Sequence, residues 1–312
     1  MMAPIENIIK VCTVIGKVKQ HLALIGANGM LASAINKLAP EVYEIIPLDL
    51  PDFDITDHYL VLNSLRKVRP NVIVNCAAYT NVDGCESEEE IAKQVNGKGP
   101  RHLANAAKEI GATLVHISTD FVFDGEKKKP YIEDDPVNPQ SAYGRTKTFG
   151  EQAVLDSGLK EYFIVRTSWL YGPGGKNFVD TIIRLAKERE ELRIVSDQVG
   201  TPTYTEDLTQ AIFSLLALDC SQFSPMPPYG TYHFSNEGEC TWYDFAKEII
   251  NQLKKQGVPL RVKEVVPIRT KEYPMPAKRP AYSVLSKEKI KATTGLKIPG
   301  WKSALEKYLT TF

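Results

Sequence analysis

The sequence lacks several features that would assign it quickly to a class of protein. Its 38 basic and 38 acidic residues cancel, so no excess positive charge favours nucleic acid or an anionic membrane. No two of its five cysteines form a Cys-x-x-Cys pair, and its five histidines show no metal-binding spacing such as His-Glu-x-x-His. We therefore expect reduced thiols, a cytoplasmic location, no metal, and neither nucleic acid nor a membrane as a partner.

Long apolar runs and internal repeats are also missing. No stretch reaches the ~18 unbroken apolar residues of a membrane span. The best N-terminal candidate, residues 11–16, is bracketed by Lys10 and Lys17 and is too short and too charged for the core of a signal peptide. Residues 1–19 are therefore predicted to be an extension that precedes the fold.

From His21 onward, short apolar runs alternate with amphipathic stretches of helical length, which is typical of βαβ units. Parallel strands need crossover connections, which are usually helical, and those helices cover the sheet. The chain is predicted to be an α/β protein with a Rossmann-type, doubly wound parallel sheet. Strands are predicted at 21–25, 44–48, 72–74, 113–117 and 162–167, and helices at 32–38, 58–67, 91–110 and 142–155.

The pattern becomes irregular after Tyr171, where residues 172–175 read Gly-Pro-Gly-Gly and break regular structure. Further on, we expect helices at 205–216 and 242–254 and a strand at 231–234 that returns to the first sheet. The predicted division is a Rossmann domain formed by residues 20–173 with the return segment 205–236. Residues 174–204 and 237–312 then form a smaller C-terminal lobe, which we expect to bind the substrate.

The first strand ends in a Gly-x-x-Gly-x-x-Ala turn, residues 26–32, that opens a helix. Glycine lets the backbone approach a pyrophosphate, whose charge is stabilised by the amides of the helix N-terminus. A plain strand-to-helix turn would look the same, but its place at the head of a βαβ series favours dinucleotide binding. The residues predicted to contact the cofactor here are Gly26, Asn28, Gly29, Met30 and Leu31.

An acidic residue is expected about twenty positions further on, to bind the ribose of the cofactor. Asp49 stands there, with Asp54 just beyond it. A carboxylate at this point favours NAD over NADP because it repels a 2′-phosphate, although the nearby basic residues cannot be located from sequence.

The most informative spacing is that of Tyr143 and Lys147, four residues apart on a predicted helix and therefore on one face of it. There the ammonium group could lower the pKa of the phenol and reach the ribose of the cofactor. Taken alone, such a pair usually marks a solvated helix face. Here it follows Ser118-Thr119-Asp120 at the end of a predicted strand, where a hydroxyl would point into the crevice at the carboxyl edge of the sheet.

With these three motifs in order, the chain resembles the extended short-chain dehydrogenase/reductases and, among them, the family of dTDP-4-dehydrorhamnose reductases. The resemblance runs from about His21 to the C-terminus. Two departures are visible: Ala32 replaces the usual third glycine, and Phe121 stands where a tyrosine is more typical. The segments that carry the resemblance are 74–83, 118–125, 143–147, 166–172 with Asn177 and Phe178, 197–203, and Arg279-Pro280.

The resemblance implies roles for individual residues. Thr119, Tyr143 and Lys147 match the catalytic triad of the family. The residues that match positions beside the cofactor in the family are Ala77, Ala78, Tyr79 and Asn96, together with Tyr143 and Lys147. The residues that we expect to line the sugar-nucleotide pocket, by the same resemblance, are Val82, Thr119, Asp120, Phe121, Tyr143, Trp169, Asn177, Gln198 and Arg279. For two of these a structural role is as plausible: Trp169 as a core aromatic and Arg279 as a stabiliser of the second lobe.

The activity implied is reduction of the C4 ketone of a dTDP-4-keto sugar, with NADPH or NADH as the hydride donor and a homodimer as a possible assembly. Two alternatives stay open. A sugar-nucleotide epimerase or dehydratase uses the same Tyr and Lys but retains its NAD through the catalytic cycle. A relative of the regulatory subunit of methionine adenosyltransferase would keep the fold and bind a partner protein.

Overall fold

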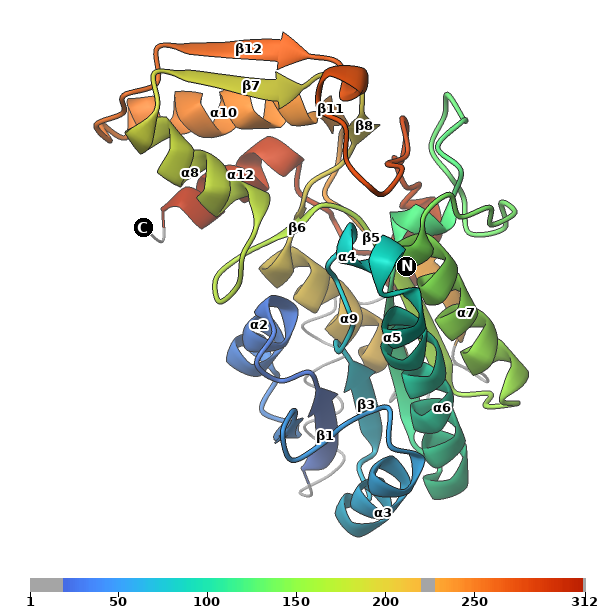
Figure 1. Ribbon diagram of the computed structural model, residues 1–312. Coiled ribbons are helices and arrows are strands. Elements are labelled where there is room, and N and C mark those ends of the chain that lie inside the picture. The colour runs from blue at the N-terminus through green and yellow to red at the C-terminus, as the bar shows by residue number, and fades with distance from the viewer. Residues whose placement is uncertain (1–18, 220–227, 311–312) are drawn as a thin grey trace.

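A six-stranded parallel sheet forms the centre of the protein in a computed structural model, which describes residues 19–219 and 228–310 (Figure 1). Almost all of the predicted N-terminal extension lies outside the described residues. The strand order is β10-β5-β4-β3-β1-β2, so the chain winds outward in both directions from the β1–β3 neighbours. The strands are β1 (Gln20–Ile25), β2 (Tyr43–Leu48), β3 (Val72–Asn75), β4 (Thr113–Thr119), β5 (Tyr162–Thr167) and β10 (Gly230–His233).

Helices cover both faces of this sheet, as the alternating pattern predicted. The core on one face is built from strand residues and from α2 (Met30–Leu38), α9 (Thr205–Asp219) and α11 (Glu288–Thr294). The core on the other face uses α3 (His58–Val68), α6 (Gly99–Ile110) and α7 (Ala142–Asp156). The sheet is therefore doubly wound, and the predicted return strand is confirmed because β10 pairs in parallel with β5.

The long helix predicted at 91–110 is interrupted in the structure. It consists of α5 (Glu89–Lys93), a π-helical turn η1 (Gln94–Lys98) and α6, after the short helix α4 (Gly84–Ser87). The turn contains Gly97, where an added Cβ would lie only 2.2 Å from the Phe149 ring of α7. Close packing against α7 thus accompanies the change in helical pitch, which the apolar periodicity could not indicate.

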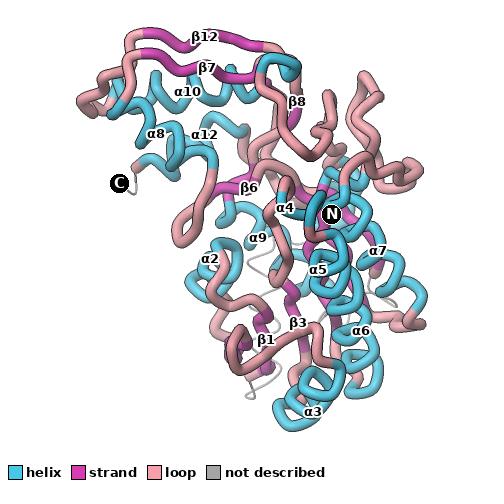
Figure 2. Tube along the Cα trace, in the orientation of Figure 1, coloured by secondary structure: helices cyan, strands magenta, loops and turns pink. Residues whose placement is uncertain are grey.

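A second core lies beyond the carboxyl edge of the sheet and contains most of the later helices (Figure 2). Its helices are α8 (Phe178–Glu188), α10 (Trp242–Lys255) and α12 (Trp301–Leu309). Thr241 begins α10 with a reciprocal capping box to Asp244. The strands of this region pair two by two: β7 (Glu191–Val195) with β12 (Glu264–Ile268), β8 (Val199–Gly200) with β11 (Cys240–Thr241), and β6 (Leu170–Tyr171) with β9 (Thr203–Tyr204).

Not all of the segment 237–312 packs in this second core. In α11, Ile290 is fully buried against the first core, and Leu296 and Ile298 after it pack there too. The chain thus crosses back to the sheet before α12 returns to the second core. The predicted division did not include this crossing, because residues 288–298 carry no sequence signal for the core they join.

Candidate active site

Many of the predicted cofactor and catalytic residues lie at the carboxyl edge of the sheet, where β1, β3 and β4 all end. Gly26 has a positive φ of 73°, and an added Cβ there would lie 2.7 Å from the backbone nitrogen of Ala77. Glycine is needed at this position because a side chain would be strained and would meet the loop after β3. The first and third strands can therefore present adjacent turns at one edge.

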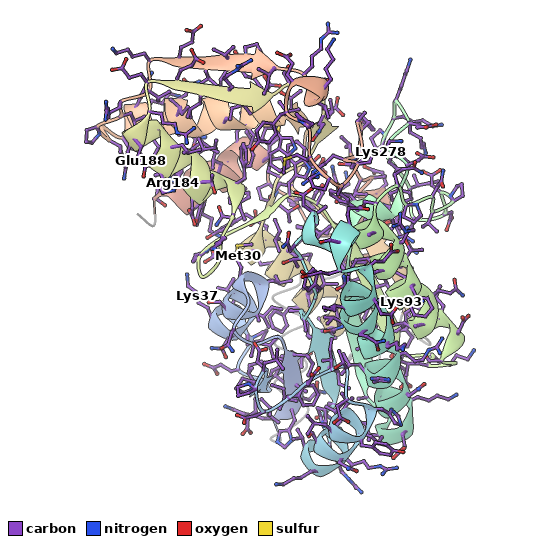
Figure 3. The ribbon with its side chains drawn as sticks, viewed as in Figure 1. Met30, Lys37, Lys93, Arg184, Glu188 and Lys278 are labelled. Atoms are coloured by element: carbon purple, nitrogen blue, oxygen red, sulfur yellow. The ribbon has the colours of Figure 1, made fainter. Side chains whose placement is uncertain are left out.

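The N-terminus of α2 is open at this edge. Gly29 occupies the N-cap in an extended conformation, and no side chain caps the first amides of the helix. Met30 and Leu31 begin the helix, with Leu31 buried in the core. Met30 faces the loop between β6 and α8 (Figure 3), and an added Cβ at Gly175 of that loop would lie 3.0 Å from Met30 Cβ. Uncapped amides beside a glycine turn make a cradle suited to an anion.

The two predicted ribose-binding acids have different surroundings. The Asp49 carboxylate accepts hydrogen bonds from the amides of Asn28 at 2.7 Å and Leu50 at 2.8 Å. Asp54 accepts from the amide and the hydroxyl of Thr56. Asp49 thus tethers the glycine turn to the end of β2, a structural role that its position in the sequence did not reveal.

Asn96 connects the loop after β3 to α7. Its side chain is 1% exposed and lies in the π-helical turn. Its Oδ1 accepts from the amide of Tyr79 at 2.8 Å, and its Nδ2 donates to the Tyr79 carbonyl at 3.1 Å and to Thr146 Oγ1 at 3.2 Å. The amide therefore holds the Ala77–Tyr79 loop next to the helix that carries Tyr143 and Lys147.

Thr119, at the end of β4, lies beside Tyr143 at the start of α7. The Ser141 side chain caps this helix, and the Thr119 hydroxyl donates to Asp120 at 3.1 Å and accepts from the amide of Phe121. A hydrogen bond with Thr119 lowers the pKa of the Tyr143 phenol, but burial raises it by more, so the pKa ends above its ordinary value. The phenol is protonated at neutral pH, which suits a proton donor.

Lys147 lies one turn below Tyr143 and is 2% exposed. Its ammonium group donates to the Ile117 carbonyl at 2.6 Å. Burial lowers the pKa of Lys147 to about 8, against the opposing effects of Glu151 and Cys76. We expected Lys147 to lower the pKa of Tyr143, but burial of the phenol is the dominant influence.

Asp120 and Phe121 complete the group at the end of β4. Asp120 is 2% exposed, and burial raises the pKa of its carboxyl to about 6 despite the hydroxyls of Ser283 and Thr119. The Phe121 ring meets the Tyr143 ring edge to face, with centroids 5.5 Å apart. We call Thr119, Asp120, Phe121, Tyr143 and Lys147 the sheet-edge residues. Val82 is half-buried in the loop that leads to α4.

The remaining predicted substrate residues, Trp169, Asn177, Gln198 and Arg279, are termed the lobe-side residues. Trp169 has a left-handed φ of 47° and stacks on Trp242 with ring centroids 3.5 Å apart and planes 9° apart. Gln198 is 8% exposed and donates to Thr270 Oγ1 at 3.0 Å. Trp242 was not predicted, although its place at the first turn of an expected helix gave a weak signal.

Asn177 and Arg279 also have partners within the protein. Asn177 is the N-cap of α8: its Oδ1 accepts from the amide of Asp180, and its Nδ2 donates to the Gly172 carbonyl at 3.0 Å and to Asp180 Oδ2 at 2.8 Å. Arg279 forms a two-point salt bridge with Asp83, at 2.5 and 2.6 Å, which lowers the pKa of that carboxyl. Arg279 was expected either to stabilise the protein or to bind the substrate, and this salt bridge is a stabilising contact. Asp83 lies in the quoted segment 74–83 but was not singled out.

The described residues contain no cluster of three or more potential metal-ligating side chains. Within the same ranges, no helix is both long and apolar enough to cross a membrane. His116 and His233, which sequence considerations treated as ordinary core or surface histidines, are both buried, and burial is the first cause that lowers the pKa of each.

Comparison with known proteins gives a consistent result. The model of the RmlD substrate binding domain family matches residues 20–312. The dTDP-4-dehydrorhamnose reductase of Burkholderia thailandensis is 40% identical over 283 residues, which cover 90% of this chain and 95% of that protein. Among solved structures, the dTDP-4-dehydrorhamnose reductase of Clostridium acetobutylicum is 45% identical with a TM-score of 0.86, covering 93% of this chain and 99% of its own.

A second solved structure is that of dTDP-4-dehydrorhamnose reductase from Bacillus anthracis in complex with NADP. It is 40% identical, has a TM-score of 0.87, and covers 95% of this chain and 100% of its own. Both the family model and these relatives span the sheet and the second core together. The chain therefore belongs to the RmlD substrate binding domain family, in agreement with the predicted resemblance to the dTDP-4-dehydrorhamnose reductases.

Proposed function

We propose that this protein is a dTDP-4-dehydrorhamnose reductase, which reduces the C4 ketone of dTDP-4-dehydro-β-L-rhamnose to give dTDP-L-rhamnose, with NADPH as the hydride donor. The observation that carries the proposal is the juxtaposition of Thr119, Tyr143 and Lys147 at the edge of the sheet next to an open glycine turn. The full-length similarity to reductases, one of them in complex with NADP, supports the same reaction and cofactor.

The glycine turn fits a dinucleotide. Gly26 lets the turn pack directly against the Ala77 backbone, and the first amides of α2 lack a side-chain cap and could bind an anion. The pyrophosphate is assigned to this cradle, with Gly26, Asn28, Gly29, Met30 and Leu31 around it and Ala77, Ala78 and Tyr79 alongside. Asp49 and Asp54 would border one ribose of the cofactor, and Lys147 would hold the other. The Asn28 and Leu50 amides bind the Asp49 carboxylate, which would weaken its repulsion of the 2′-phosphate of NADPH. When bound, NADPH supplies the hydride that reduces the ketone carbon.

The side chains of the protein supply the proton and the charge stabilisation. Thr119 donates its hydroxyl hydrogen bond to the ketone oxygen, which polarises the carbonyl group and orients it towards Tyr143. As negative charge develops on that oxygen, the Tyr143 phenol transfers its proton to it and becomes a phenolate. The Lys147 ammonium group stabilises the phenolate until a proton from solvent restores the phenol. One hydride and one proton are consumed, and the ketone becomes a secondary alcohol.

The substrate is assigned to the space between the sheet edge and the second core. Val82, Asp120 and Phe121 would line it from the sheet, together with Arg279, which is bound to Asp83 beside Val82, and Trp169, Asn177 and Gln198 would line it from the other side. Phe121 supports this placement, since its ring already contacts the proposed acid. Because Asn177, Gln198 and Arg279 belong to the smaller lobe, residues 174–204 and 237–312, we assign part of the substrate binding to that lobe.

The decisive experiment follows NADPH absorbance while the dTDP-4-keto sugar is generated in situ, and identifies the product by mass and NMR spectroscopy. We expect stoichiometric oxidation of NADPH and formation of dTDP-L-rhamnose. An epimerised or dehydrated product formed without net NADPH consumption would instead identify an epimerase or dehydratase. Absence of any turnover in a folded protein that binds a partner protein would favour the regulatory alternative.

A further inference from the structure

Helix α7 carries a second buried charge that the proposed chemistry does not use. Glu151, one turn beyond Lys147, has a side chain that is 5% exposed. Its two carboxylate oxygens accept hydrogen bonds from Arg166 Nε at 2.9 Å and Nη2 at 2.7 Å. Arg166 belongs to β5 and is 7% exposed, so both members of this two-point salt bridge are removed from solvent. Such a pair is costly to bury and rigid once formed.

Arg166 is held from its other side as well. Its Nη1 lies 3.4 Å from His233 Nε2 of β10 and 3.4 Å from the Glu133 carbonyl. The guanidinium carbon is 5.2 Å from the centroid of the Phe123 ring. These contacts fix the guanidinium group, and the guanidinium group in turn fixes the carboxylate of Glu151, which follows Lys147 by four residues on the same face of α7.

Lys147 is electrostatically coupled to three ionisable groups, Cys76, His116 and Glu151, and lies one helical turn from a fourth, Tyr143. Burial raises the pKa of the Cys76 thiol, at the end of β3, to about 12, and burial also raises the pKa of Tyr143. Burial and the Lys147 charge lower the pKa of His116 on β4, which is therefore neutral. Of these four groups, Glu151 is the one held as an ion, by its salt bridge to Arg166.

We propose that the Glu151–Arg166 pair is a positioning device for Lys147, in which the fixed carboxylate stabilises the ammonium form of the lysine and thereby sets the upper pH limit of catalysis. This inference rests on the proposed function, because it assumes that the ammonium form is the one used. Glu151 is a positioning residue and touches neither substrate nor cofactor. Its effect on Lys147 has the required sign, since Glu151 is the largest influence that raises the pKa of this buried lysine.

The test is the pH profile of kcat/KM for the wild type and for Glu151→Gln, an isosteric change that removes the charge. The wild type should lose activity as the pH rises through about 8, where Lys147 loses its proton. In Glu151→Gln the alkaline limb should move down by about one pH unit, because one opposite charge has been removed next to the lysine. If Glu151→Gln folds and its alkaline limb lies at the same pH as that of the wild type, the proposal is overturned.

Two control variants separate this electrostatic role from a merely structural one. Glu89→Gln removes an exposed salt bridge with Arg145 on the same helix, and its limb should stay at the wild-type pH. Arg166→Lys keeps the charge but not the two-point geometry, and its limb should move less than that of Glu151→Gln. If Glu151→Gln does not fold, the double variant Glu151→Gln/Arg166→Met replaces the whole buried pair and should show a smaller downward shift, because the positive charge of Arg166 is removed together with the carboxylate.

A second test does not depend on the reaction. The free energy of unfolding is measured as a function of pH for the wild type and for Lys147→Met, and the value for the variant is subtracted from that for the wild type. Since burial depresses the pKa of Lys147 from 10.5 to about 8, the unfolded state binds more protons in that window, and this difference should rise with pH from about 8 upward. In the Glu151→Gln background the rise should begin at lower pH, and a rise at unchanged pH overturns the inference. Full activity of Lys147→Met would instead contradict the proposed function, while the unfolding measurement would still decide the role of Glu151.

Discussion

The sheet-edge residues and the lobe-side residues are held in different ways. At the sheet edge, the Thr119 hydroxyl lies close enough to the Tyr143 phenol to affect its pKa, and a ketone oxygen could accept hydrogen bonds from both groups. On the lobe side, the polar ends of Asn177, Gln198 and Arg279 are engaged with other parts of the protein. Substitution of the Tyr143 hydroxyl should therefore change turnover at nearly constant stability, whereas substitutions of Asn177, Gln198 or Arg279 should change stability first.

Removal of the proposed acid should have the largest effect. Tyr143→Phe deletes one hydroxyl and keeps the ring that packs against Phe121, so we expect an unchanged melting temperature. Turnover should fall by about 10²–10⁴-fold, the usual contribution of a general acid. Tyr59→Phe is the control, because Tyr59 is 76% exposed and distant in role. If Tyr143→Phe keeps more than about a tenth of the turnover, another group donates the proton.

Truncation of Trp169, which stacks on Trp242, tests the lobe-side residues. Trp169→Ala should lower the free energy of unfolding by about 3 kcal/mol, the low end for such truncations, because the ring is half-buried and stacked on Trp242. A double-mutant cycle with Trp242→Ala should give a coupling of about 0.5–1.5 kcal/mol. Steady-state kinetics on the same preparations complete the test: an unchanged melt with a raised KM for the sugar nucleotide would move Trp169 into the substrate site.

A substitution in the glycine turn should weaken NADPH binding much more than it lowers the stability of the fold. Gly29→Val places a branched side chain at the N-cap of α2, where a Cβ would lie 3.1 Å from the Gly26 carbonyl and the pyrophosphate should approach. We expect the Kd for NADPH, measured by fluorescence titration, to rise at least about tenfold, or ~1.4 kcal/mol. Gly300→Val is matched to it, since Gly300 caps α12 in an extended conformation with open space around it. Equal NADPH affinity in wild type and Gly29→Val would make this turn purely structural.

The smallest effect is expected at Asn177. Asn177→Ala removes the N-cap of α8, which should cost about 1 kcal/mol of unfolding free energy. Asn177→Asp keeps an oxygen for the Asp180 amide, but it loses the donor to Gly172 and to Asp180 Oδ2 and places a second carboxylate beside Asp180, so its melting temperature should also fall. A KM that rises tenfold in both variants without a change in melting temperature would give Asn177 a direct part in substrate binding.

Much of the first domain could be predicted because its signals are local. The strands and helices from His21 to Thr167 lie within a few residues of the expected positions, since apolar periodicity and the glycine turn depend on near neighbours. The π-helical turn at 94–98 and the crossing of α11 to the first core were missed. Both result from packing against segments distant in the sequence, namely Phe149 for the first and α9 with β10 for the second.

The sequence by itself determined which chemistry is available: a glycine turn after β1, and Tyr143 and Lys147 on one helical face, because the spacing along a helix sets which side chains lie together. Only the tertiary structure decided what surrounds those groups. Burial sets the pKa values of Tyr143 and Lys147, and burial is a property of all the elements packed around a side chain. The salt bridge of Glu151 with Arg166 likewise depends on where β5 lies under α7, fifteen positions away along the chain.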